Sequence, residues 1–158
     1  MRTSGARELD LPEDSSASQL ACWSICGRKY FFRYVAKADP EFRSPSLLLS
    51  SAFHSTIGWF FEQKLKGRRP HPEQAEAIFE ADFTADVSEG NVRWGQKAEE
   101  EVGLQGRSLV RAYLKAFLGL PVAHVQQPYR VGIEDSETGL SLPRAFKGYF
   151  DLVLKDRT

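Results

Sequence analysis

The 158-residue sequence contains only two cysteines, has no net charge at neutral pH and lacks any long hydrophobic run. Two cysteines are too few for a disulfide scaffold, so we expect a reducing, cytoplasmic environment. Because no apolar stretch approaches the roughly 20 residues that cross a bilayer, we expect no transmembrane helix and no membrane partner. Residues 1–18 are polar and have no apolar centre, so we also expect no secretory signal.

The composition is typical of a folded domain, but the charge is unevenly distributed. Hydrophobic residues make up 42% of the chain and aromatic residues 12%, which argues against disorder, and the length suits one domain. Residues 28–69 contain nine basic residues against three acidic ones, whereas residues 70–106 contain nine acidic residues against two basic ones. The basic segment either faces a polyanion such as nucleic acid or forms a solvated face that attracts the acidic segment.

The residue pattern predicts helices first and a β-hairpin last, which is an α+β fold. Residues 1–15 have no periodicity and are predicted to be a flexible leader, and Ser16-x-x-Gln19 has the spacing of a capping box. Apolar spacing, caps and prolines predict helices over residues 16–35, 46–66, 72–90 and 92–118. Apolar residues then alternate with a period of two, which predicts strands at 122–134 and 140–154 in a hairpin that spans 122–155.

One carboxylate, Asp151, lies inside the apolar run Phe146–Leu154, which predicts a buried strand. An isolated buried carboxylate is costly, so we expect Asp151 to be paired or bound to a metal. His54 lies among small residues in the middle of a predicted helix, where a ligand can approach closely. Imidazole and carboxylate groups are donors that divalent metals accept, although a lone helical histidine is more often a packed or surface residue.

The two cysteines, Cys22 and Cys26, are four residues apart and would share one face of a helix. Zinc and iron–sulfur sites usually need four ligands, and the sequence has no other cysteine. Core packing is therefore the favoured role for both residues.

The segment Arg28–Tyr34 interleaves cations with aromatic rings. One interpretation is a nucleic-acid surface, in which the cations bind phosphates and the rings lie near the bases. The other is an amphipathic helix with a buried aromatic face and solvated cations. We expect Phe31 and Phe32 to be in the core, whereas both interpretations stay open for the cations. The candidate nucleic-acid-binding residues are Arg28, Lys29, Tyr30 and Arg33.

Five short motifs follow one another along the chain. They are Ser16-x-x-Gln19-Leu20, Cys26-Gly27-Arg28-Lys29-Tyr30-Phe31-Phe32-Arg33-Tyr34, Ala52-Phe53-His54, Gly106 in a long helix, and Gly148-Tyr149-Phe150-Asp151-Leu152-Val153. Their order and spacing, from about Ser16 to Leu154, resemble the RecB-like branch of the PD-(D/E)XK nuclease superfamily. That branch includes AddB-type recombination nucleases and CRISPR-associated exonucleases.

The resemblance implies a helical N-terminal half packed on the first strands of a restriction-endonuclease-like mixed sheet. It matches His54 to the helix histidine that contacts a catalytic metal and Asp151 to the central metal-binding aspartate. Cys26 matches the first cysteine of an iron–sulfur cluster found in some members, which only an intact protein with further cysteines would complete. Arg28 and Lys29 match a basic segment near the nucleic-acid path.

The sequence also departs from the family pattern. Gly27 and Ser50 stand where many members carry proline and glycine, and the segment Val125-Gln126-Gln127-Pro128-Tyr129 has glutamine where many members carry glutamate. No Asp/Glu-x-Lys motif follows Asp151 within the 158 residues. Residues 16–158 are therefore expected to be a partial nuclease domain that is inactive alone.

By this resemblance, the intact protein would be a DNA nuclease that uses Mg²⁺ or Mn²⁺ to hydrolyse phosphodiester bonds. It would act in DNA repair, recombination or a CRISPR-type system, with DNA and a helicase or another repair subunit as partners. Two alternatives stay open. One is a nucleic-acid-binding module that keeps a nuclease-like fold without catalysis, and the other is a structural interaction domain in which His54 and Asp151 never meet.

Overall fold

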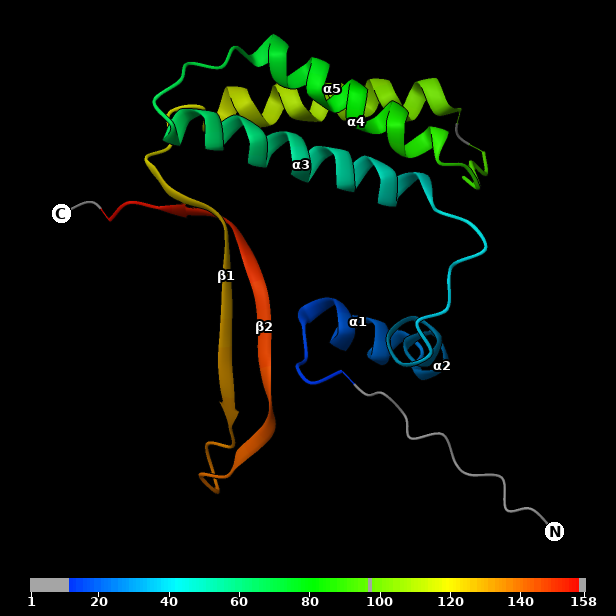
Figure 1. Cartoon of the computed structure of the whole chain (residues 1–158), viewed down its shortest axis with the longest axis vertical. Coiled ribbons are helices and arrows are strands. Elements are labelled where there is room, and N and C mark those ends of the chain that lie inside the picture. Colours follow the sequence, from blue (N-terminus) through cyan, green and yellow to red (C-terminus); the bar gives the residue numbers. More distant parts are fainter. Residues whose placement is uncertain (1–11, 97, 157–158) are drawn as a thin grey trace. The chain divides into compact units, whose positions relative to one another are not determined.

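The computed structural model describes residues 12–96 and 98–156, and it confirms the predicted α+β fold class. The helices are α1 (Ala17–Ile25), α2 (Gly27–Tyr30), the π-helical turn η1 (Phe31–Val35), α3 (Pro45–Leu65), α4 (Pro72–Ser88) and α5 (Glu99–Phe117). The strands β1 (Val122–Glu134) and β2 (Ser141–Leu154) pair in a hairpin (Figure 1). The described residues form two compact units, the first comprising 12–39 and 128–149 and the second comprising 40–96, 98–127 and 150–156.

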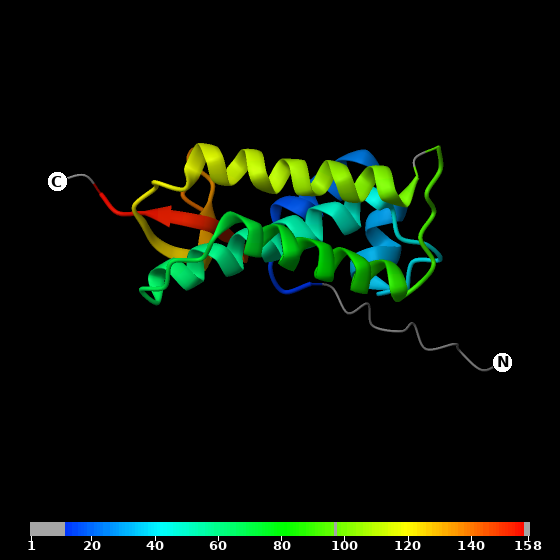
Figure 2. The ribbon, with the colours of Figure 1, turned by 90° about the horizontal axis from the view of Figure 1, so that it is seen from above.

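The second unit is organised around helices α3, α4 and α5, which lie side by side in both views (Figure 1, Figure 2). Ser44 caps α3 by accepting a hydrogen bond from the Leu47 N–H, and Pro45 occupies the first turn. The fully buried core side chains between the helices include Leu48, Phe60, Phe61, Phe79, Val110 and Leu114. The hairpin contributes Val122 to this core, so helices and strands share one hydrophobic interior.

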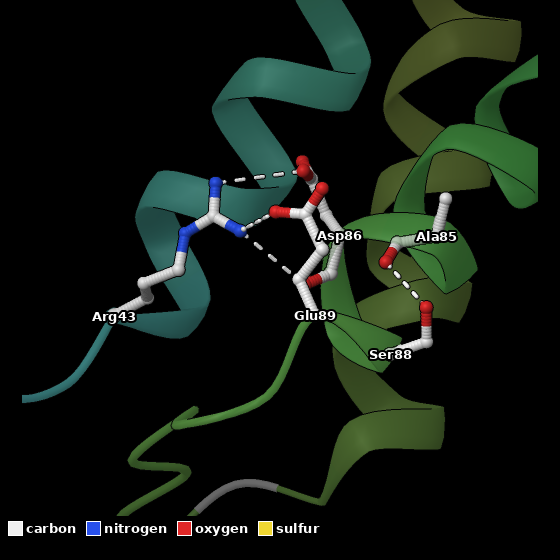
Figure 3. A network of polar contacts seen from close by, with 5 residues as sticks. All are labelled: Arg43, Ala85, Asp86, Ser88 and Glu89. Atoms are coloured by element: carbon white, nitrogen blue, oxygen red, sulfur yellow. Dashed lines mark hydrogen bonds and ion pairs between the residues drawn. The ribbon is translucent and has the colours of Figure 1, made fainter.

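The prediction that the long helix begins at residue 92 is wrong, because α5 begins at Glu99. Asn91 and Gly95 adopt left-handed backbone conformations, with φ of 59° and 65°, which a continuous helix does not allow. The loop is held by Arg43, whose N–H donates to the Asn91 carbonyl at 2.8 Å. The Arg43 guanidinium also lies 3.0 Å from a Glu89 oxygen and 3.5 Å from an Asp86 oxygen at the end of α4 (Figure 3).

Helices α4 and α5 approach closely at Gly106. The Phe79 ring of α4 is fully buried and stacks on Phe83 with centroids 5.7 Å apart. A Cβ atom built on Gly106 would lie 2.0 Å from Phe79 Cζ, far inside van der Waals contact. At Gly103, one turn earlier, a Cβ atom would lie an ordinary 3.5 Å from Phe83. The glycine at position 106 is therefore required by packing, whereas the glycine at position 103 is not.

In the first unit, the continuous helix predicted over residues 16–35 is broken at Cys26. The capping box is present, since Ser16 and Gln19 each bond the other's backbone N–H. Cys26, however, has extended backbone angles (φ −162°, ψ 109°), and Gly27, a weak helix former, begins α2. Cys22 is buried as expected, but Cys26 is exposed, so core packing was the wrong prediction for Cys26.

Phe31 and Phe32 also contradict their predicted place in the core. Their exposed fractions are 39% and 46%, and both belong to the π-helical turn η1 rather than to a regular α-helix. A π-helix advances with a different residue period from an α-helix, so the face that α-helical spacing assigned to the core is displaced. The aromatic face that was expected to be buried is therefore exposed, and the Phe32 ring lies beside Arg28.

Two residues of the predicted leader, Asp14 and Ser15, are held against the hairpin, and residues 1–11 lie outside the described residues. Ser15 pairs with the strand at Phe146, accepting from the Lys147 N–H at 2.8 Å and donating to the Ala145 carbonyl at 2.9 Å. Asp14 accepts two hydrogen bonds from the Arg130 guanidinium, which lower the pKa of its carboxyl group.

Replacing Gly106 with alanine should destabilise the protein by about 1–3 kcal/mol, because the added methyl group forces the buried Phe79 ring to move. The gain in helix propensity, about 1 kcal/mol, offsets only part of this cost. Urea unfolding monitored by circular dichroism measures the difference in the free energy of unfolding.

The matched control is Gly103→Ala in the same helix. Its methyl group meets no clash, so the propensity gain should appear as a stabilisation of up to about 1 kcal/mol. Equal effects of the two substitutions would show that the contact between Gly106 and Phe79 does not constrain the helix packing.

Candidate functional site

His54 and Asp151, the residue pair singled out from the sequence, lie together in the second unit. His54 projects from the middle of α3, and Asp151 lies near the C-terminal end of β2. The His54 Nδ1 atom is 3.4 Å from the Asp151 Oδ1 atom. Helix and strand are far apart in sequence, so the tertiary fold creates this juxtaposition.

Asp151 is not buried, which corrects the expectation of a buried strand. Its side chain is 69% exposed and that of His54 is 53% exposed, and the neighbouring Phe150 is also exposed. The described sheet has two strands, and such a sheet cannot cover both of its faces. The cost of burying a carboxylate therefore does not explain why Asp151 has a partner. The evidence for the pair is the distance between the two side chains.

The position of Asp151 is fixed by its neighbour Leu152. Successive side chains of a strand point to opposite faces, and Leu152 packs against the core of the second unit. This contact anchors the end of β2 while Asp151 stays accessible. Close to the pair, Phe53 makes edge-on contacts with the His54 ring at 5.8 Å and the Tyr113 ring at 5.6 Å.

Tyr113 lies close enough to the pair to be affected by the charge of Asp151. Burial raises the pKa of the Tyr113 hydroxyl, and the negative charge of Asp151 raises the pKa further. The Asp151 carboxylate is therefore close enough to act on a neighbouring group through space. A cation placed beside His54 and Asp151 would be stabilised by the same charge.

The donor types and their separation fit a shared divalent cation. At 3.4 Å the Nδ1 and Oδ1 atoms are close enough to share one cation, and the same distance suits a direct ion pair between imidazolium and carboxylate. Among the described residues, no cluster of three or more histidine, cysteine, aspartate or glutamate side chains is arranged to hold a metal. The pair therefore supplies two ligands, and any remaining positions would fall to water, substrate or other groups.

A shallow depression of about 450 Å³ lies beside His54. Trp59 and Gln126 line it, and neither was singled out from the sequence as a candidate ligand-binding residue. Trp59 falls in a run of aromatic residues that indicates core packing, and Gln126 lies in the segment Val125–Tyr129, which stands out in the sequence only as a departure from the family pattern. Its unusual backbone conformation, with φ of 48°, is a signal that only the structure provides.

The predicted nucleic-acid-binding residues lie in the first unit on α2 and η1. Arg28, Lys29 and Arg33 are exposed, and Tyr30 is half-buried. Exposed aromatic rings accompany them, with the Arg28 guanidinium 5.7 Å from the Phe32 centroid. Arg33 lies 5.4 Å from the Tyr34 ring and Tyr30 lies 5.4 Å from Trp23. Cys26, the candidate iron–sulfur ligand, is exposed next to this segment.

Within the described part of the chain, no helix has the length and apolar character needed to span a membrane. Comparison with curated proteins and with solved structures finds no match. The family model of the PD-(D/E)XK nuclease superfamily, by contrast, matches residues 14–158, which is nearly the whole chain. Nucleases of this superfamily bind nucleic acid and generally use divalent metal ions such as Mg²⁺. The α+β fold and the extent of this match show that the chain belongs to the PD-(D/E)XK nuclease superfamily.

Proposed function

We propose that the chain carries the first metal ligands of a DNA nuclease that uses Mg²⁺ or Mn²⁺. The observation that supports this most directly is the 3.4 Å separation of His54 Nδ1 and Asp151 Oδ1 on a helix and a strand. Both side chains are accessible, so an ion and a phosphodiester can reach them from solvent. The Asp151 carboxylate is the type of oxygen donor that Mg²⁺ and Mn²⁺ take, and the His54 imidazole adds a nitrogen donor of the type found at transition-metal sites.

Each residue would have a defined part in phosphodiester hydrolysis. His54 and Asp151 would hold the ion, which supplies activation of water and stabilisation of negative charge at the phosphate when it is bound. Leu152 would fix the strand, because it packs on the core beside Asp151. The His54 ring would be oriented by its edge-on contact with Phe53.

The motif order supports assignment to the RecB-like branch, with AddB-type and CRISPR-associated exonucleases as the related groups. Cys26 has a free, exposed thiol, which leaves it available as a ligand of an iron–sulfur cluster that further cysteines would complete. In this proposal, the protein acts on DNA in repair, recombination or a CRISPR-type system, with a helicase or other repair subunit as its partner.

A non-catalytic nucleic-acid-binding module is the second candidate, and the surface of α2 and η1 favours it. Arg28, Lys29 and Arg33 lie exposed beside aromatic rings, an arrangement that suits phosphates and unstacked bases. Only two metal ligands come together among the described residues at the candidate site. This candidate requires nucleic-acid binding without a metal.

We expect the 158-residue polypeptide to bind Mn²⁺ weakly through His54 and Asp151 without cleaving DNA. Removing either side chain, as His54→Ala or Asp151→Ala, should weaken Mn²⁺ binding by about tenfold or more, because one of only two protein ligands is lost. The paramagnetic resonance signal of free Mn²⁺ measures the binding, and a gel assay with Mg²⁺ measures cleavage.

The matched control for this experiment is His71, whose Nδ1 atom lies 3.6 Å from a Glu73 carboxylate oxygen on α4. His71→Ala should leave Mn²⁺ binding unchanged. Equal losses at His54 and His71 would reduce the candidate site to an ordinary surface pair. Robust Mg²⁺-dependent cleavage that Asp151→Ala abolishes would show that the polypeptide is an active nuclease and would contradict the expected inactivity.

We also expect the exposed cations of α2 to bind DNA phosphates without sequence preference. The double substitution Arg28→Ala and Lys29→Ala should weaken binding and reduce the slope of log affinity against log salt. Each lost contact should lower that slope by about 0.9 for duplex or 0.7 for single strands. Fluorescence anisotropy of a labelled oligonucleotide over a series of salt concentrations measures both quantities.

A pair of arginines on α5 provides the control. Arg107 and Arg111 face Glu80 and Glu76 on α4, at 3.6 and 2.6 Å, so their charges are already compensated. Replacing both with alanine should change the salt slope less. If the Arg28 and Lys29 variant binds DNA with an unchanged slope, those side chains are only a solvated face.

A further inference from the structure

We propose that the depression beside His54 binds a single unpaired nucleobase, and that the proposed nuclease therefore engages single-stranded DNA. The inference rests on the proposed function, because it concerns the surface next to the His54–Asp151 pair. The depression measures about 450 Å³ and is lined by His54, Gly58, Trp59 and Gln126, together with Ser51, Ser55 and Glu62. It lies entirely within the second unit.

The first observation is the backbone of Gln126, which has φ of 48°. A glutamine in the left-handed region is held there against its own preference, and such residues occur mostly at functional sites or at bulges. The side chain lies over helix α3, because a Cβ atom built on Gly58 would be 3.1 Å from Gln126 Nε2. Gly58 thus leaves the space that the carboxamide occupies, one helical turn from His54.

The second observation is the chemistry of the lining. Trp59 offers an aromatic surface, and Gln126 offers a carboxamide whose donor and acceptor match the edge of a base. The depression holds no lysine or arginine, and its one carboxylate, Glu62, faces Lys66 at 3.6 Å. The lining therefore offers no free cation for a phosphate, whereas the ring of Trp59 and the carboxamide of Gln126 suit a planar, uncharged group.

These features require an unpaired nucleotide. In a duplex, both faces of a base are stacked on its neighbours, so Trp59 cannot reach them without unstacking. In a single strand, the base can turn onto an aromatic side chain while its edge meets a polar group. A base held beside His54 would place the adjoining phosphate near the His54–Asp151 pair.

The experiment compares two short single-stranded oligonucleotides of equal length and charge, one with normal bases and one made entirely of abasic nucleotides. Binding to the 158-residue polypeptide is measured by anisotropy without divalent metal, so the metal site does not contribute. The wild-type chain should bind the strand with bases about tenfold more tightly, the effect of one stacked base. Gln126→Gly should remove most of this preference.

Gln126→Gly also distinguishes function from folding. Glycine accepts φ of 48° without strain, so the thermal unfolding midpoint should stay the same or rise while base preference falls. Gly58→Ala should reduce the preference in the same way by displacing the carboxamide. Gly103→Ala, whose added methyl group makes an ordinary contact, should leave the preference unchanged.

Two outcomes would overturn the proposal. Either the wild-type chain shows no preference for strands that carry bases, or Gln126→Gly keeps the full preference and the strained backbone only forms a bulge in β1. In both cases, loss of Mn²⁺ binding in His54→Ala and Asp151→Ala would still support the proposed metal site. Failure of the base pocket is thus distinguishable from failure of the proposed nuclease function.

Discussion

The buried face of helix α3 is the constraint on which the candidate site depends. Leu48, Ala52 and Phe60 are almost completely inaccessible and fix the rotation of the helix against α4 and α5. Once that face is buried, the helical period places His54 and Gly58 toward the strands. The same core receives Leu152, so one hydrophobic interior positions both His54 and Asp151. A substitution in this core would move both side chains without touching them.

The hairpin and the middle helices were predictable because their local signals agree with one another. Helix α3 has a serine cap, a first-turn proline and a terminal glycine at position 67 with φ of 75°, so its predicted bounds are nearly right. The hairpin loop is closed by Asp135, whose carboxylate accepts from the backbone N–H groups of Glu137 and Thr138. Turn chemistry of this kind depends on neighbouring residues alone.

The errors lie where tertiary contacts override local preference. The loop before α5 is held by Arg43, which precedes α3 in the sequence, a contact that no local pattern reveals. The break at Cys26 and the π-helical turn after it replace one predicted helix with three short pieces. At Cys26 a single residue in extended conformation separates α1 from α2, whereas Gly90, Asn91 and Gly95 all have positive φ between α4 and α5.

The candidate site was predictable only in part. One of the arguments that led to it agrees with the structure and another does not. The motif order pointed to His54 and Asp151, and the structure brings the two side chains together. The argument from a buried carboxylate was wrong, because the strand is exposed. Gln126 and Trp59 were missed as ligand-binding candidates, because backbone strain and the shape of a depression arise only when helix and strand meet.

The structure also shows what becomes of the unevenly distributed charge. Acidic side chains of the second unit are compensated by nearby arginines. The acidic residues of α4 face arginines within the second unit, as Glu76 faces Arg111 and Asp86 faces Arg43. For Arg28 and Arg33, the contacts within the described residues are with aromatic rings, which leave the positive charge uncompensated. Acidic residues of α4 thus form ion pairs within the second unit, whereas we expect the cations of the first unit to attract polyanions. A net charge of zero thus conceals a surface suited to the backbone of nucleic acid.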